Sequence, residues 1–155
     1  MHLLNTLLGK IQNEVETNSN LDYIVHCEAV QALTADIIAR MVHETPSCLI
    51  FPVSTSFTEA SMAYAELDHI YQINMAVFVD NYGDDNNAFI DTYDGFKSLP
   101  QIESDFMGVF NRETFSISGL QQAYFQGATY SGIAIDERSI AQNIMRMQYK
   151  YMDCE

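Results

Sequence analysis

The feature that most constrains the fold is an unbroken alternation of residue types near the middle of the chain. Successive side chains of a β-strand point to opposite faces of a sheet, so residues at every second position share a face. One such set is wholly apolar: Tyr71, Ile73, Met75, Val77 and Val79. The intervening set is mixed: Gln72, Asn74, Ala76, Phe78 and Asp80. This spacing predicts a strand with one buried face and one partly polar face.

The end of the chain repeats the alternation. Met145, Met147, Tyr149 and Tyr151 alternate with Arg146, Gln148 and Lys150. This pattern predicts a terminal strand that is buried on one side and carries basic residues on the other.

The start of the chain has a different period. Its apolar residues recur at helical spacing, at Leu3, Leu4, Leu7, Leu8, Ile11 and Val15. They predict an amphipathic helix that ends near Thr17–Asn20. Together these elements indicate an α+β fold. We expect a mostly antiparallel sheet of about four strands with helices packed on one face.

Size and composition indicate one folded domain over residues 1–155. Hydrophobic residues make up 48% of the chain and aromatic residues 12%, which is too apolar for a disordered segment. The 21 acidic residues against seven basic ones give a net charge of −14, and they are scattered rather than gathered in a tail. Because no Lys/Arg cluster is present, we expect no sequence-specific contact with nucleic acid and no binding to an anionic membrane.

Cysteine usage and hydropathy also limit the options. Cys27, Cys48 and Cys154 are odd in number and widely spaced, which favours free thiols in a reducing compartment. No apolar run approaches the ~18 residues of a membrane span. The apolar N-terminus lacks a basic lead-in and a small-residue cleavage site, so we interpret it as part of the fold rather than as a signal peptide.

Two interpretations are open for residues 23–44. Tyr23–Val30 predicts a strand in which Tyr23, Val25 and Cys27 share a face, and Ala32–Glu44 predicts a helix after it. The alternative is a single helix across both segments.

The next segment predicts a short buried strand followed by a long excursion. Cys48–Val53 is apolar, and Pro52 within it indicates an edge strand or a strand end, since proline has no N–H for a central ladder. Ser54–Asp68 is polar and rich in small residues, and it predicts either a hairpin arm or a loop. Farther on, Arg112–Glu137 predicts one or two strands plus irregular chain, with turns at Gly119, Gly127 and Gly132.

The acidic stretch from Phe78 to Phe96, FVDNYGDDNNAFIDTYDGF, resembles a calcium loop only superficially. An EF-hand needs oxygen ligands at positions 1, 3 and 5, glycine at 6 and an acid at 12, and no starting aspartate satisfies this pattern. The stretch is better explained as a turn that starts a helix capped by Asn86 or Asn87. The inward face of that helix would hold Phe89, Tyr93 and Phe96. A second helix follows, with Ile102, Phe106, Val109 and Phe110 inward.

No motif of known catalytic chemistry is present. The chain has no phosphate loop, no GxSxG, no HExxH and no CxxC. A zinc site from His26, Cys27, His43 and Cys48 is disfavoured, because neighbours on a strand point to opposite faces. The sequence leaves a Cys nucleophile with a His base open, although no local pattern marks one. We therefore predict a protein that is not an enzyme, with no catalytic residue, metal ligand or cofactor.

The order of these elements resembles that of the small tail-terminator and tail-completion (neck) proteins of long-tailed bacteriophages. In that family a helix precedes a P-x-apolar strand, a Y-x-I-x-V-x-V strand follows, and a short I-x-F-x-Y strand closes the fold. The matching residues here are Pro46 with Leu49–Phe51, then Tyr71, Ile73, Met75 and Val77, then Met145, Met147 and Tyr149.

The resemblance implies a structural virion protein, made in the host cytoplasm, that caps the tail tube and joins it to the head connector as a homo-oligomer, often a hexameric ring. A ring subunit needs an arm that reaches its neighbour. On this reading Ser54–Asp68 is the arm, and the candidate subunit contacts are Thr58, Met62 and Tyr64. Acidic surface would dock onto basic partners or repel DNA in a lumen.

Two other functions compete with this one. A strongly acidic small protein is also typical of DNA-mimicking inhibitors of nucleic-acid-binding enzymes, which would place acids in phosphate-like rows on one face. The even scatter of acids and the clean apolar alternation argue against that arrangement. The other competitor is a small enzyme with an acidic pocket around Asp80–Asp94.

Overall fold

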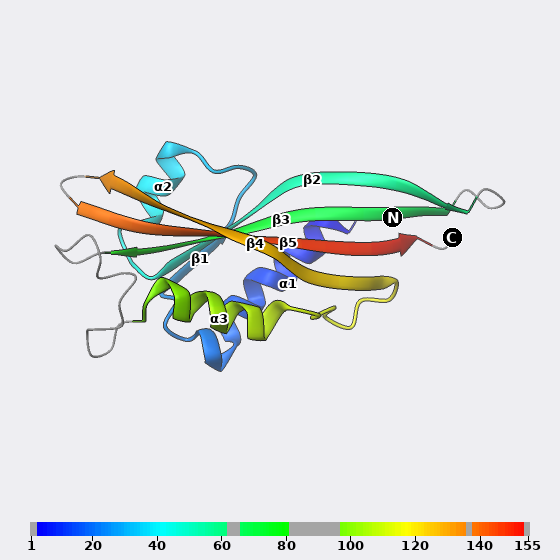
Figure 1. Cartoon of the computed structure of the whole chain (residues 1–155), viewed down its shortest axis with the longest axis horizontal. Coiled ribbons are helices and arrows are strands. Elements are labelled where there is room, and N and C mark those ends of the chain that lie inside the picture. Colours follow the sequence, from blue (N-terminus) through cyan, green and yellow to red (C-terminus); the bar gives the residue numbers. More distant parts are fainter. Residues whose placement is uncertain (1–2, 62–65, 81–96, 136–137, 154–155) are drawn as a thin grey trace.

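Five strands form one sheet whose two faces are covered by different helices (Figure 1). The computed structural model describes residues 3–61, 66–80, 97–135 and 138–153. In chain order the elements are α1 (Leu4–Thr17), the short 3-10 helix η1 (Ser19–Leu21), β1 (His26–Ala29), α2 (Ala35–Met41), β2 (Ser47–Ser61), β3 (Glu66–Asp80), α3 (Leu99–Phe110), β4 (Leu120–Ile135) and β5 (Arg138–Asp153).

The strand order is β1-β2-β3-β5-β4, and only the β1–β2 pair is parallel. The predicted α+β class with a mostly antiparallel sheet is therefore confirmed, with five strands rather than about four. The chain-terminal strand β5 lies inside the sheet, between β3 and β4, and the edges belong to β1 and β4.

The predicted alternation in β3 is confirmed by its burial. Tyr71, Ile73, Met75 and Val77 are completely buried on the face that carries α1 and α3. The inward residues of β5, from Met145 to Tyr151, continue the same layer.

Two amphipathic helices cover this face of the sheet. Leu7, Ile11 and Val15 of α1 are buried there, which confirms the predicted N-terminal helix. From α3, Ile102, Phe106 and Phe110 join the same core, as predicted. The hydroxyl of Ser98 caps α3 by accepting a hydrogen bond from the Gln101 N–H at 3.4 Å.

The opposite face of the sheet is partly covered by α2, so the prediction that helices pack on one face only is wrong. Met41 and Val42, at the end of α2, pack against Leu49, Phe51 and Phe78 in a second, smaller core. Phe78 is completely buried, although the sequence placed it on the partly polar face. The physical reason is that the parallel strands β1 and β2 need a crossover connection, and the helix of that connection, α2, lies over the sheet. Farther along, the same face carries Gln72, Asn74, Arg146 and Gln148, which are only half buried.

Residues 23–44 form a strand and then a helix, so the single-helix alternative is wrong. Both elements are shorter than predicted. β1 begins at His26, and Val25 before it is 56% exposed instead of sharing a buried face with Cys27. The helix α2 begins only after Thr34, whose hydroxyl accepts the hydrogen bond from the Ile37 N–H at 3.3 Å.

The strand predicted over Cys48–Val53 extends to Ser61. β1 pairs with β2 only as far as Ile50, so Pro52 lies where β2 has become an edge, as its missing N–H indicated. Of the predicted arm, residues 54–61 belong to β2 and residues 66–68 to β3, and these strands pair with each other.

The longest departure from prediction is β4, one continuous strand of 16 residues. Gly119 does lie in a turn, with φ of +89°. The predicted turns at Gly127 and Gly132 are wrong, because both glycines lie inside the strand. Gly127 sits at a bulge with φ of +146°, and a Cβ there would come within 2.6 Å of the Arg146 guanidinium. The predicted helix over residues 86–96 falls outside the described residues.

Candidate functional site

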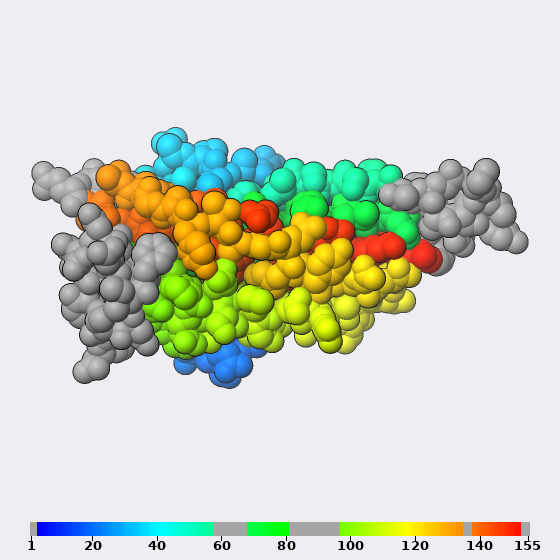
Figure 2. Space-filling view, in the orientation of Figure 1, coloured from blue at the N-terminus to red at the C-terminus, as the bar shows by residue number. Residues whose placement is uncertain are grey.

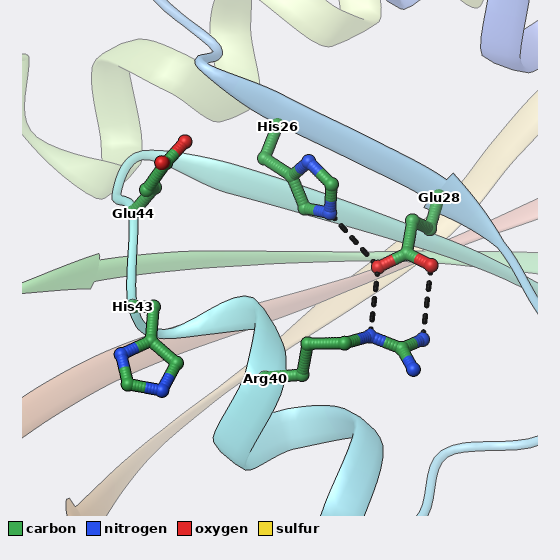
Figure 3. A pocket seen from close by; sticks show the side chains of 5 residues that line it. All are labelled: His26, Glu28, Arg40, His43 and Glu44. Atoms are coloured by element: carbon green, nitrogen blue, oxygen red, sulfur yellow. Dashed lines mark hydrogen bonds and ion pairs between the residues drawn. The ribbon is translucent and has the colours of Figure 1, made fainter.

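Among the described residues, a pocket lies between β1 and the end of α2 (Figure 3). Its volume is about 490 Å³, and its lining residues come from two elements and the turn after them. His26 and Glu28 project from β1, Arg40 projects from the last turn of α2, and His43 with Glu44 follow that helix.

The centre of this pocket is the carboxylate of Glu28. Arg40 binds it with two hydrogen bonds, Nε to Oε2 at 3.1 Å and Nη2 to Oε1 at 2.9 Å, and His26 Nε2 lies 2.8 Å from Oε2. The hydrogen bond with His26 and those from Arg40 lower the pKa of Glu28. Glu28 is therefore a firmly ionised carboxylate with both oxygens engaged.

This geometry limits the chemistry that the pocket can perform. A carboxylate held by a bidentate guanidinium is a poor general base and a poor metal ligand. His43 and Glu44 point away from the Glu28 cluster (Figure 3), and in the described part of the chain no three His, Cys, Asp or Glu side chains converge as a metal site. The observed contacts tie β1 to α2, which is a structural role.

The two described cysteines lie on the other face of the sheet from His26. Cys27 and Cys48 are in register across the β1–β2 pair, and both are buried among residues of the larger core. The prediction that His26 and Cys27 diverge is thus confirmed. Hydrogen bonding to Cys27 and burial raise the pKa of the Cys48 thiol, which keeps it protonated and a weak nucleophile.

The start of the acidic segment is also engaged within the fold. Arg138 donates to Asp80 Oδ2 from Nη2 at 2.6 Å and from Nε at 2.9 Å, and its Nη1 donates to the Val42 carbonyl at 2.9 Å. Arg138 thus links β3, β5 and the end of α2. The remaining aspartates of the proposed acidic pocket, Asp84 to Asp94, lie outside the described residues.

A similar cluster fixes the N-terminus of α3. Burial alone would raise the pKa of Asp105, but hydrogen bonds from Lys97, Tyr23 and Gln101 outweigh it and lower that pKa. Lys97 also lies over the Tyr23 ring, with its Nζ 4.4 Å from the ring centroid. These contacts hold the chain before β1 against α3.

The second candidate site consists of the outer strands of the sheet. Among the described residues, six large hydrophobic side chains are exposed, and four of them lie on β2 and β4. They are Val53 and Phe57 on β2, exposed by 57% and 53%, and Tyr124 and Tyr130 on β4, exposed by 37% and 43%. Contiguous apolar patches mark surfaces that another protein covers, whereas single exposed apolar residues are common, so these four residues count as candidates only beside the edges of the sheet on which they lie.

Only one of the three predicted subunit contacts lies within the described residues. Thr58 lies on β2, opposite Asp68 of β3, whereas Met62 and Tyr64 lie outside the described residues. Sequence reasoning missed Val53 and Phe57. Val53 was placed at the end of a predicted buried strand, and the only signal for Phe57 was an isolated aromatic residue after the polar run Ser54–Ser56.

None of the described helices is long and apolar enough to cross a membrane. No known protein family and no curated protein matches this sequence.

Proposed function

We propose that this protein is a structural subunit of the neck of a long-tailed bacteriophage, which caps the tail tube and joins it to the head connector as a homo-oligomeric ring. The observation that carries the proposal is the hairpin of β2 and β3. Its far half extends beyond α2 and β1 (Figure 1) and carries Val53 and Phe57 exposed to solvent.

The order of elements supports the same function. The helix α1 precedes the strand that follows Pro46, β3 holds the Tyr71–Val77 alternation and β5 closes the fold, as the resemblance implies, whereas the helix α2 and Pro52 within β2 depart from the family pattern. The space-filling view shows an elongated subunit with the β2–β3 hairpin toward one end (Figure 2). Such a shape suits a subunit that reaches its neighbour in a ring.

Surface charge supports docking onto basic partners. Within the described part of the chain, four of the seven basic side chains are held in ion pairs with acids of the same chain: Arg40, Lys97, Arg138 and Lys150. Few cations therefore offset the remaining acids of a chain whose net charge is −14. This distribution favours contact with basic protein surfaces and opposes contact with DNA phosphates.

The test combines mass in solution with binding to tail tubes. The protein would be measured by light scattering across concentrations, and then mixed with tubes polymerised from a bacteriophage tail-tube protein. We expect a ring, either in solution or at the tube end, visible by negative-stain electron microscopy. The proposal would be overturned if the protein stays monomeric, does not bind tail tubes and instead binds or inhibits a DNA-processing enzyme. That result would support the DNA-mimic alternative.

A matched pair of variants tests the arm. Val53→Ser changes the exposed residue of β2 directly before the arm, and Val25→Ser makes the same change at an equally exposed valine near β1. If the arm is buried against a neighbour, Val53→Ser should weaken ring formation by about 1–2 kcal/mol, or roughly 5- to 30-fold. Val25→Ser should leave it unchanged. Equal behaviour of the two variants would contradict the role of the arm.

A further inference from the structure

The edge strand β4 lacks the features that normally keep sheet edges apart. It is the last strand in the sheet order, so no described strand pairs with its outer side. Edge strands are usually protected by lysines, prolines or inward-pointing charges. The 16 residues of β4, LQQAYFQGATYSGIAI, contain no charged residue and no proline, in a protein whose net charge is −14.

Part of this edge is already covered within the subunit. The Arg112 N–H donates to the Ala123 carbonyl at 2.6 Å, and the Phe125 N–H donates to Asn111 Oδ1 at 3.3 Å. The backbone groups of Ala123 and Phe125 therefore point away from β5.

Strand alternation then fixes the direction of the backbone groups farther along β4. Past the bulge at Phe125–Gly127, the residues whose backbone groups face outward are Ala128, Tyr130, Gly132 and Ala134. The half of β4 from Ala128 to Ala134 is thus oriented to accept another strand.

A second edge lies on the other side of the same sheet. β1 covers β2 only as far as Ile50, so β2 from Phe51 to Ser61 borders the sheet. The Ile50 carbonyl accepts from the Val30 N–H at 2.8 Å, so the groups of Ile50 face outward. The register with β3 shifts by one residue at the bulge between Pro52 and Ser54. Beyond this bulge, the backbone N–H and C=O groups of Thr55 and Phe57 also point away from β3. Between Phe51 and Ser61 the only charged residue is Glu59.

We propose that the outer half of β4 pairs, antiparallel, with the outer half of β2 from a second copy of this chain. This inference rests on the proposed ring and names the contact that builds it. Three successive antiparallel pairings make β4 run opposite to β2 within one subunit. A rotation axis along the strands preserves that relation, so β4 meets the neighbour's β2 in antiparallel orientation.

Side-chain placement fits the pairing. Tyr130 of β4 and Phe57 of β2 both lie on the face of the sheet that carries α1 and α3, by their register with Asn143 and His69. Within the subunit the Tyr130 hydroxyl donates to Glu103 of α3 at 2.6 Å, and the Phe57 ring packs edge-on against His69. Joining the edges would bring the exposed parts of both rings onto the same face of a continuous sheet, where cross-strand aromatic pairs are stabilising.

The stagger between the two edges sets the strand tilt of a closed ring. Tyr130 pairs with Asn143 of β5, which in turn pairs with Val77 of β3. On the other side of β3, Thr55 pairs with Tyr71 and Phe57 pairs with His69. Pairing Tyr130 with Thr55 or with Phe57 therefore shifts the neighbour by six or eight positions along β3. At ~3.3 Å per position this shift is ~20 Å for six positions and ~26 Å for eight. The repeat from β2 to the neighbour's β2 crosses four strand spacings, ~19 Å in total, so the tilt is ~46° for six positions and ~54° for eight. Closed β-barrels have strand tilts of roughly 35–45°, so the six-position register lies close to that range and the eight-position register lies above it.

Charge explains why the partner is a second copy. Two copies that each carry −14 repel one another over most of their surfaces. The uncharged β4 edge and the nearly uncharged β2 edge let them approach without placing like charges together. Both halves of the contact are present in every subunit, on opposite sides of the sheet, so the association continues until it closes.

The test is disulfide cross-linking in the full chain with Cys154→Ser. Ser131→Cys on β4 is combined with Ser54→Cys or with Ser56→Cys on β2; all three serines are exposed. The first pair faces across the interface at the six-position register and the second at the eight-position register. The control pairs Ser131→Cys with Ser19→Cys, an exposed serine of η1. Protein alone and protein on tail tubes are both oxidised and run without reductant.

We expect a ladder of linked multimers from one of the β2 pairs. Facing cysteines have effective concentrations near millimolar, so linkage should exceed that of the control by about 100-fold at ~10 μM protein. Mixing the two single-cysteine proteins should give linked dimers only.

Two results would overturn the edge pairing. One is a ring that caps tubes while neither β2 pair cross-links, which leaves the proposed function intact. The other is self-linkage of Ser131→Cys alone, which would show a closed β4–β4 dimer. A linked ladder from a protein that does not cap tubes would support the edge pairing and count against the proposed function.

Discussion

Truncation of Phe78 tests the part of the fold that the sequence did not predict. Phe78→Ala removes a completely buried ring from the second core, between the sheet and the end of α2. A buried Phe removes about 150–250 Å² from water, or about 4–6 kcal/mol at ~25 cal/mol per Å², as an upper bound. Phe→Ala changes in cores cost about 3–5 kcal/mol.

We expect about 3 kcal/mol for Phe78→Ala, because α2 is only seven residues long and can settle into part of the cavity. Domains of this kind have about 5–15 kcal/mol of stability, so the variant should fold. If Phe78→Ala does not fold, Phe78→Leu can be measured instead, with an expected loss of about 1 kcal/mol in the free energy of unfolding.

The assay is urea unfolding followed by circular dichroism, with the free energy of unfolding extrapolated to water. Gln72→Ala is the control. Gln72 lies on the same face of β3 but is half buried and outside the second core, so its cost should stay within about 0.5 kcal/mol. If Phe78→Ala costs no more than Gln72→Ala, α2 does not cover this face and the reasoning fails.

Three further predictions concern polar contacts, each measured by the same unfolding assay. Arg138→Met removes the hydrogen bonds to Asp80 and should lower the free energy of unfolding by about 1–3 kcal/mol. Arg138→Lys should lower it by a smaller amount. If Arg138→Met leaves the free energy of unfolding unchanged, the link between β3 and β5 does not stabilise the fold. The pKa of Glu28 is lowered in the folded protein, so its ionised form stabilises the fold above a pH of ~4.3 and this contribution is lost as pH falls below that value. Glu28→Gln should therefore be less stable than the parent by about 1 kcal/mol at pH 7 and by less at pH 3, and a constant difference would contradict this assignment. Ser98→Ala removes the cap of α3 and should cost about 0.5–1 kcal/mol, while Ser98→Thr should retain most of it; equal losses would show that the cap is not used.

Local patterns identified the elements that bury one face along their whole length. Apolar residues recur at the strand period in β3 and β5 and at the helical period in α1 and α3. The spacing of these residues therefore predicts which face of each element is buried. β4 was divided wrongly because it has no such repeat. It is held mainly by backbone pairing with β5, which tolerates glycines and polar residues at an edge.

The candidate sites depended on contacts between distant residues. Arg40 donates hydrogen bonds to Glu28 because α2 folds back over the sheet. No local sequence pattern around either residue predicted this contact. Val53 and Phe57 became candidates only when β1 was seen to end at Ile50, which leaves the rest of β2 at the border of the sheet.

By itself, the amino-acid sequence determined the fold class, the two alternating strands and the two amphipathic helices, because periodicity is a property of neighbouring residues. Tertiary structure alone decided the strand order, the helix on the second face and the two borders of the sheet. These features depend on which distant segments pair through backbone hydrogen bonds, and the backbone is chemically the same at nearly every residue.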